Sequence, residues 1–314
     1  MPNSAAFATD LILHHYDASP FSEKVRLMLG VKALAWRSVL TPNIMPKADL
    51  TPLTGGYRRA PVMQVGADIF CDSQVIMAEI ERRSPGPRPD GAAGAPWAVN
   101  LWADRLFFQA TVPIIFGELG DRVPAAFIAD REKLSGRPFD VAAMKAAAGP
   151  MRGQWRAQAA WIEEALAAGR GDFLAGPSAG LTDIAAYMNI WFLRGATPHL
   201  ARELLAGFER IAAWQGRLAA VGHGQRDEIT GAQALEVARQ SAPADIAAHD
   251  PADPLGLSPG AAVVVAADDY GRDPISGTLV AANAARVVIA RDERSLGRLH
   301  VHFPRAGYIV APAP

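Results

Sequence analysis

The chain has 314 residues, half of them hydrophobic, which provides enough apolar surface for a folded core divided between two or three domains. Its formal net charge of −1, with no long basic block, argues against a sequence-independent attraction to nucleic acid or to anionic membrane surfaces. A single cysteine, Cys71, excludes an internal disulfide, a dithiol redox cycle and a zinc site built from several thiolates.

The first predicted domain covers residues 8–84 and mixes strands with helices. The spacing of apolar residues predicts strands at 11–16, 36–40, 60–65 and 68–71, and helices at 19–31 and 74–83. A stretch interrupted by Pro and Gly separates the second strand from the third. This order fits one small α/β domain.

A Pro- and Gly-rich linker at 84–96 separates this unit from an all-helical second domain at 96–240. Helical patterns cover residues 97–119, 138–168, 182–195 and 200–221. The aromatic residues that recur on these helices are interpreted as core, although those on the first helix are also candidates for a pocket wall.

The last predicted domain, residues 243–314, contains five short β-rich runs separated by Gly, Asp, Asn and Pro. This pattern is typical of a small barrel or a compact sheet. Its charges form no basic block, and the run DDYGRD reads as an ordinary polar turn. We interpret the domain as a structural or interaction module.

Ser19 and Pro20 lie where the first strand passes into the first helix. A serine hydroxyl can accept a hydrogen bond from an orphan amide of the helix, and proline suits the first helical position, so this pair predicts a helix start. The same geometry can stabilise an anion, because the free amides and the positive end of the helix dipole lie beside a hydroxyl donor. Since the chain lacks a second cysteine, any thiolate held there would belong to a ligand.

Two further motifs follow in the same domain. Pro61 opens a strand within RRAPVMQ, and it marks either an edge-strand start or a cis bond that turns backbone toward a ligand. Asp72 and Ser73 precede the next helix, where they provide either a cap or a carboxylate and amides for the charged end of a ligand. Each motif alone favours the local structural role, but their convergence on one end of a small α/β domain favours a ligand site.

The ordered set SPFSEKVR, RRAPV and DSQVI, followed by DFLAGPSAGLTDIAAY, closely resembles the cytosolic glutathione S-transferases over residues 10–225. The resemblance implies a thioredoxin-like α/β N-terminal domain and an all-α glutathione-transferase C-terminal domain, here followed by the additional all-β, barrel-like domain. It also implies glutathione as a substrate and a homodimer.

The resemblance assigns roles residue by residue. Ser19 matches the catalytic position, where the family has serine or cysteine that donates a hydrogen bond to the glutathione thiolate. Val62, after the expected cis-proline, would pair its backbone with the cysteinyl unit, and Arg59 matches a basic position near the glycyl carboxylate. Asp72 and Ser73 match the pair that binds the γ-glutamyl end.

Two departures from the family pattern are visible. Gly180 stands where the capping box of the buried helix in the second domain normally has Ser or Thr, with Asp183 in its expected place, and we expect folding to survive at modest cost. The β-rich region after residue 243 is absent from the common two-domain pattern. It could cover the active site, build a dimer interface or bind a partner.

The sequence therefore predicts a cytoplasmic glutathione transferase, with no metal and no membrane or nucleic-acid partner. It would activate the glutathione thiol for attack on a small hydrophobic electrophile, by conjugation, isomerisation or thiol-dependent reduction, in detoxification. Residues of the helical pattern 97–119 would line the pocket for the electrophile. The alternative is a noncatalytic glutathione-transferase-like scaffold for protein interactions.

Several other residues are weaker candidates. Ser22 is a reserve stabiliser of the thiolate, whereas His15 and Tyr16 fit strand-end positions. His300 and His302 alternate onto one strand face without a third metal ligand at a suggestive spacing. Cys71 is interpreted as a partly buried strand residue, although its place beside Asp72 also suits an oxidisable thiol.

Overall fold

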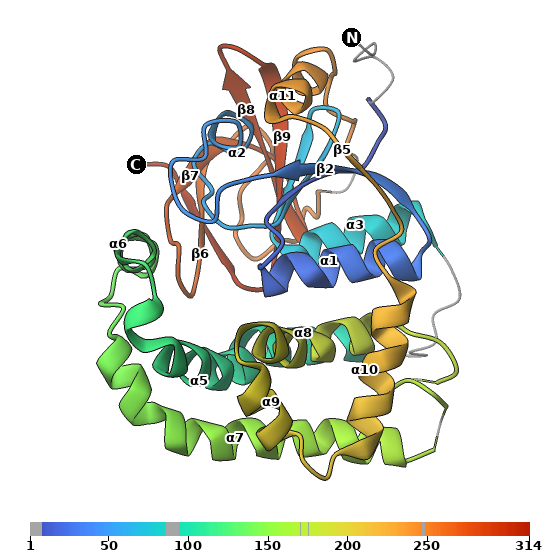
Figure 1. The fold of residues 1–314 in the computed structure, drawn as a ribbon. Coiled ribbons are helices and arrows are strands. Elements are labelled where there is room, and N and C mark those ends of the chain that lie inside the picture. The colour runs from blue at the N-terminus through green and yellow to red at the C-terminus, as the bar shows by residue number, and fades with distance from the viewer. Residues whose placement is uncertain (1–7, 86–93, 170, 175, 247–248) are drawn as a thin grey trace.

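The computed structural model describes residues 8–85, 94–169, 171–174, 176–246 and 249–314. Figure 1 shows a large sheet, a layer formed by two helices against one of its faces, and a bundle of helices beyond that layer. The predicted linker falls largely on 86–93, outside the described residues. None of the helices in the described ranges has the length and hydrophobicity that a membrane crossing requires.

The first domain has the predicted thioredoxin-like order of strands and helices. Its elements are β1 (Ile12–His15), α1 (Pro20–Val31), β2 (Ala35–Leu40), α2 (Thr51–Thr54), β3 (Val62–Val65), β4 (Asp68–Cys71) and α3 (Ser73–Arg83). β1 pairs in parallel with β2 and antiparallel with β3, which pairs antiparallel with β4. The only element that the periodicity did not predict here is the one-turn helix α2, in the stretch interrupted by Pro and Gly.

The helical domain follows, and the structure confirms its all-α character. Its elements are α4 (Ala95–Trp102), a π-helical turn (Ala103–Phe107), α5 (Phe108–Leu119), a 3-10 turn (Gly120–Arg122), α6 (Ala125–Ser135), α7 (Val141–Ala167), α8 (Leu181–Ala196), α9 (Pro198–Leu204) and α10 (Glu209–Val221). Trp155 and Trp214 are fully buried in its core, as the aromatic pattern predicts.

Helix α8 begins without a side-chain cap at Gly180, and Asp183 supplies the missing polar contacts. The carboxylate of Asp183 accepts hydrogen bonds from the backbone N–H of Gly180 at 3.1 Å, from that of Leu174 at 2.8 Å and from Trp214 Nε1 at 2.7 Å. Because Asp183 is fully buried, these three donors are what make its burial tolerable. The departure from the family capping box therefore removes one hydrogen bond and keeps the others.

Residues 225–239, which the sequence grouped with the helical domain, return to the sheet. They form β5 (Gln225–Glu228), which pairs in parallel with β2, and α11 (Gly231–Arg239). Ala234 and Val237 of α11 pack against Ile12 and Val39 of the sheet. Helical periodicity ends at α10, and a four-residue exposed strand carries too weak a pattern to mark the change of layer.

The C-terminal region has five strands, as predicted. They are β6 (Ala262–Ala267), β7 (Ile275–Ala282), β8 (Arg286–Glu293), β9 (Gly297–Pro304) and β10 (Tyr308–Pro312). They form an antiparallel sheet that continues the N-terminal one, because β9 pairs in parallel with β4. One ten-stranded sheet results, in the order β10-β6-β7-β8-β9-β4-β3-β1-β2-β5, in place of a separate barrel.

The junction between β9 and β4 has an apolar core and a polar contact. Val301 and Phe303 share a core cluster with Ile69 of β4 and Leu53 of α2. Beside it, His302 Nε2 lies 2.8 Å from Asp68 Oδ1, and both side chains are almost fully buried. The C-terminal domain is thus joined to the first domain by backbone pairing and a shared core, which fixes where its loops lie.

Candidate glutathione site

The N-terminus of α1 has the geometry that the sequence predicts. Ser19 is the N-cap in an extended conformation, and its Oγ accepts a hydrogen bond from the backbone N–H of Ser22 at 3.1 Å. Pro20 occupies the first helical position, where no donor is lost. Because the Ser19 oxygen acts as an acceptor, its own O–H is still able to donate. Ser22 is fully buried, and within the described part of the chain its hydroxyl has no hydrogen-bond partner.

The N-terminus of α3 is built around Asp72. This residue has a φ of 96°, a backbone conformation that non-glycine residues rarely adopt and that is typical of functional sites. Its Oδ1 accepts a hydrogen bond from the backbone N–H of Gln74 at 2.9 Å and so caps the helix. Ser73 is the first residue of the helix and is buried.

The Ala60–Pro61 peptide bond is cis. Val62 then enters β3 with His14 of β1 on one side and Cys71 of β4 on the other, so its backbone faces neighbouring strands. Ala60 lies before the strand and is only partly buried. Ala60 is therefore the neighbour of Pro61 that lies outside the strand pairing, whereas Val62, to which the sequence assigned the backbone contact, has a paired strand on each side.

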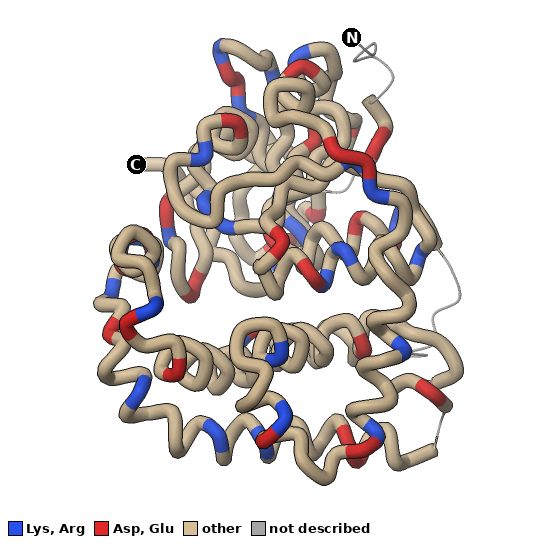
Figure 2. The backbone as a smooth tube through the Cα atoms, in the orientation of Figure 1, with Lys and Arg blue, Asp and Glu red and all other residues tan. Residues whose placement is uncertain are grey.

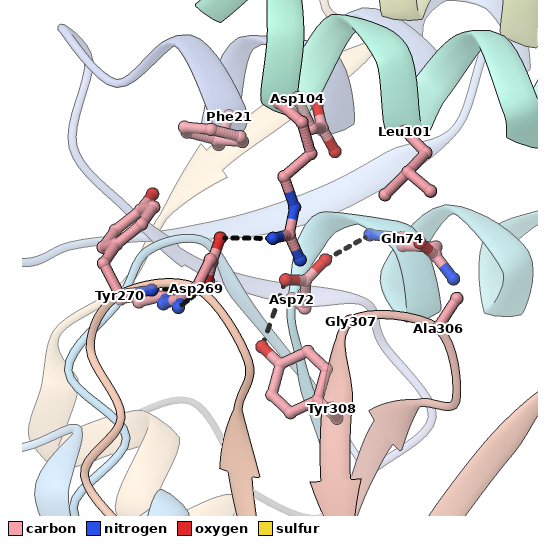
Figure 3. A pocket seen from close by; sticks show the side chains of 12 residues that line it. Phe21, Asp72, Gln74, Leu101, Asp104, Asp269, Tyr270, Ala306, Gly307 and Tyr308 are labelled. Atoms are coloured by element: carbon pink, nitrogen blue, oxygen red, sulfur yellow. Dashed lines mark hydrogen bonds and ion pairs between the residues drawn. The ribbon is translucent and has the colours of Figure 1, made fainter. Parts of the chain in front are cut away.

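A small cavity of about 30 Å³ lies where the first domain, the helical domain and the C-terminal domain meet (Figure 3). Arg59 and Asp72 are the two predicted site residues that line it. Ser19, Val62 and Ser73 do not, although Phe21, two residues after Ser19, does. The other lining residues are Gln74, Leu101, Asp104, Arg105, Asp269, Tyr270, Ala306, Gly307 and Tyr308.

Arg59 and Asp72 are both in contact with the C-terminal domain. The hydroxyl of Tyr308 donates to Asp72 Oδ2 at 3.1 Å, and it also lies 3.1 Å from the hydroxyl of Tyr57. Arg59 forms an ion pair with Asp269, and its guanidinium carbon lies 4.1 Å from the ring centroid of Tyr270. Burial raises the pKa of Tyr308 well above its usual value, so its phenol stays protonated and is a hydrogen-bond donor.

The helical domain contributes Asp104 and Arg105, both from the π-helical turn that interrupts the long helix. Arg105 forms ion pairs with Asp268 at 2.5 Å and Asp269 at 3.6 Å. Asp104 accepts a hydrogen bond at 2.6 Å from Lys24, a fully buried residue of α1. Burial raises the pKa of Asp104, and the ammonium of Lys24 opposes that shift.

Sequence reasoning missed most of the residues that line this cavity. The run DDYGRD does form a turn, but Asp268, Asp269 and Tyr270 also make contacts across domains. The sequence signal that could have indicated these contacts was two adjacent acidic residues followed by an aromatic residue between two predicted strands. The aromatics expected to form a pocket wall on the first helix of the helical domain do not line the cavity; Leu101, Asp104 and Arg105 of that helix do.

The remaining candidate residues are Cys71, His300 and His302. Burial raises the pKa of the Cys71 thiol well above its usual value, which keeps it protonated. His300 and His302 both lie near the Asp68 carboxylate. Among the described residues, no group of three or more His, Cys, Asp and Glu side chains is arranged to hold a metal ion. Figure 2 shows basic and acidic residues interspersed along the chain.

Comparison with known proteins identifies the class. Residues 13–88 match the family described as glutathione S-transferase, N-terminal domain, and residues 121–215 match the glutathione S-transferase C-terminal domain. The chain is 34% identical to a GST-like protein from Pseudomonas syringae, with a TM-score of 0.79 over 96% of this chain and 100% of that one. The chain therefore belongs to the glutathione S-transferase family. No curated protein matches it.

Two other solved structures are similar to this chain over about two thirds of its length. FzlA from C. crescentus is 24% identical, with a TM-score of 0.51 over 67% of this chain and 88% of that one. A Tau class glutathione S-transferase from mango, Mangifera indica, is 18% identical, with a TM-score of 0.51 over 67% and 89% of the two chains. The Pseudomonas syringae match extends much further along this chain and so includes the β-rich C-terminal domain.

Proposed function

We propose that this protein is a glutathione transferase, in which the thiol of glutathione is activated at the N-terminus of α1 and attacks a hydrophobic electrophile. One observation carries the proposal: in a chain of this family, Arg59 and Asp72 line one cavity beside the first turn of α1. Conjugation, isomerisation and thiol-dependent reduction are all within the reach of such a thiolate.

Each end of glutathione has a group of opposite charge available. The glycyl carboxylate pairs with Arg59, and the ammonium of the γ-glutamyl end pairs with Asp72, assisted by Ser73 and the free amides of α3. The backbone of Ala60, rather than that of Val62, contacts the cysteinyl unit. These assignments place the sulfur near Ser19.

Ser19 holds the thiolate by donating its hydroxyl hydrogen bond. A thiol pKa near 8.5 falls to about 6.5 when the thiolate is favoured by roughly 2.7 kcal/mol. One charge-assisted hydrogen bond and the positive end of α1 together supply about that amount. Ser22 provides a second hydroxyl in the same first turn.

The electrophile binds against apolar side chains of the two common domains. Phe21 lies 5.0 Å from Phe108 between ring centroids, and Phe108 lies 6.2 Å from Phe192, which continues an aromatic wall away from the cavity. Leu101 is 40% exposed and also lines the cavity. Such a wall favours a poorly soluble substrate, consistent with detoxification in the cytoplasm.

Titration with glutathione by calorimetry tests the proposal. We expect saturable binding that weakens at least tenfold in Asp72→Asn, because the ammonium of the ligand loses its counter-charge. Asp121→Asn, an exposed acidic position in the helical domain, is the matched control and should leave the affinity unchanged. The proposal is wrong if neither the wild-type protein nor a variant lacking the Arg59–Asp269 ion pair binds glutathione at millimolar concentration.

We also propose that the protein is a homodimer, as its family membership suggests. Size-exclusion chromatography with light scattering tests this directly, and a single monomeric peak across the concentration range would refute it. A noncatalytic scaffold remains the second candidate, favoured by the contacts that the C-terminal domain makes with Arg59 and Asp72. Full glutathione affinity without turnover of an activated aryl halide would support that candidate.

A further inference from the structure

We propose that the C-terminal domain regulates the glutathione site as an internal competitor, with the Asp269 carboxylate on Arg59 and the Tyr308 hydroxyl on Asp72. The inference rests on the proposed function, since it concerns the same two residues. Figure 3 shows Asp269, Tyr270 and Tyr308 reaching the cavity from the C-terminal strands, opposite Asp72 and Gln74 of the first domain.

Asp269 lies in the loop between β6 and β7, and Tyr308 is the first residue of β10, directly after the loop between β9 and β10. The backbone N–H of Asp268 donates to the carbonyl of Gly307 at 3.0 Å, which links the loops to each other. The N–H of Gly271 donates to the carbonyl of Leu134 in α6 at 2.6 Å. The first loop is therefore held against the helical domain as well as against Arg59.

Gly271 permits this close approach. Its φ of 60° lies in the left-handed region, and a Cβ there would be 2.8 Å from the Leu134 side chain and 3.0 Å from Arg59 Nε. A larger residue would push the loop away from both. The close fit indicates that the contact with Arg59 is a defined arrangement of the chain.

The two contacts use the groups that glutathione needs. Glutathione carries two carboxylates and one ammonium group. The Arg59 guanidinium, which would pair with one of these carboxylates, already pairs with Asp269. Both oxygens of Asp72 are also engaged, one by the N–H of Gln74 and the other by Tyr308. A ligand that binds both residues must displace the Asp269 carboxylate from Arg59 and the Tyr308 hydroxyl from Asp72.

The size of the cavity leads to the same conclusion. Its volume of about 30 Å³ leaves room for only a few water molecules, whereas ligand pockets commonly measure about 300 Å³ or more. A tripeptide therefore binds only when the loops move. The contacts that must break are polar: the Asp269 contact lies in a loop, and the Tyr308 contact is made by a hydroxyl at the start of β10, while the Tyr308 ring lies with Phe303 in the core.

Such a competitor lowers the apparent affinity for glutathione by the fraction of molecules whose loops are open. Removing the charge of Asp269 frees Arg59 and raises that fraction. We therefore expect Asp269→Asn to bind glutathione at least fivefold more tightly than the wild-type protein. Asp273→Asn removes the same charge from the same loop at an exposed position outside the cavity, and it should leave the affinity unchanged.

The experiment is calorimetric titration of the full chain with glutathione, for the wild type, Asp269→Asn, Tyr308→Phe and Asp273→Asn. Thermal unfolding of each variant confirms that it is folded. Tyr308→Phe frees one oxygen of Asp72 without changing charge, so it should also tighten binding and provide a second, independent arm. In parallel, hydrogen exchange at the Gly271 amide should accelerate when glutathione saturates the wild-type protein.

Four outcomes overturn the inference. Equal, measurable affinities in all four proteins would reject internal competition and leave the glutathione function standing. Weaker binding in Asp269→Asn would make that carboxylate a ligand contact. An absence of binding in every protein would reject the proposed function and the inference with it. Unchanged exchange at Gly271 with glutathione bound would show that the loop is not displaced.

Discussion

Removing one partner of the buried ion pair between Lys24 and Asp104 should be one of the most destabilising single changes at the contact between the first domain and the helical domain. The Lys24 ammonium lies 2.6 Å from Asp104 Oδ1 and 2.8 Å from Asn100 Oδ1, with the lysine fully buried and the Asp104 side chain 14% exposed. At an effective dielectric constant of about 20, two unit charges at this distance attract each other by about 6 kcal/mol before desolvation is counted.

We expect Lys24→Met to lower the free energy of unfolding by about 3–5 kcal/mol, because it leaves the Asp104 carboxylate buried without its cation. The double variant Lys24→Met/Asp104→Leu removes both charges and should recover much of this loss. Urea denaturation followed by tryptophan fluorescence measures each unfolding free energy and gives the coupling energy of the pair.

An exposed ion pair of the C-terminal sheet provides the comparison. Arg298 and Asp292 lie 4.0 Å apart, with side chains 56% and 80% exposed, so their coupling energy should be far smaller. The reasoning would be refuted if Lys24→Met cost less than about 1 kcal/mol, or if the double variant were as unstable as the sum of the two single variants.

Three other predictions concern stability and reactivity. Burial lowers the pKa of His14 to about 4 and of His15 to about 3, so between about pH 6.5 and pH 4 only the unfolded chain binds these protons. The free energy of unfolding, measured by urea denaturation, should therefore fall as the pH is lowered through this range, by about 2 kcal/mol per histidine at about pH 5. A flat profile would contradict this. Asp183→Ala should lower the free energy of unfolding by about 3 kcal/mol or more, measured by urea denaturation, because it removes the acceptor of Trp214 Nε1 and of two backbone amides. Cys71 should resist alkylation until the chain unfolds, and rapid labelling of the native protein would disprove its burial.

Local signals were sufficient for much of the fold and for part of the site. Ser19 with Pro20 marked the start of α1, and Asp72 marked the start of α3, because capping depends on residues close in sequence. Arg59 was assigned through the family resemblance and does line the cavity. The role expected of Val62 stays a prediction, and its place between two paired strands could not be deduced from the motif.

The contribution of the C-terminal domain could not be predicted. Pairing of β9 with β4 joins residues that are more than 200 positions apart, and no local pattern specifies such a contact. For the same reason Asp269 was interpreted only as part of a polar turn and Tyr308 only as part of a β-rich run, whereas the sheet places them beside Arg59 and Asp72. The five short strands, expected to form a small barrel or a compact sheet, form half of one continuous sheet.

The pKa of bound glutathione tests the central claim of thiol activation at α1 most directly. The thiolate absorbance of the complex, followed against pH at saturating glutathione, should show a thiol pKa about two units below that of free glutathione. In Ser19→Ala this pKa should return most of the way to the free value, and Ser19→Cys should retain the shift. An unshifted thiol in the wild-type complex, or a shift that Ser19→Ala leaves intact, would contradict the account.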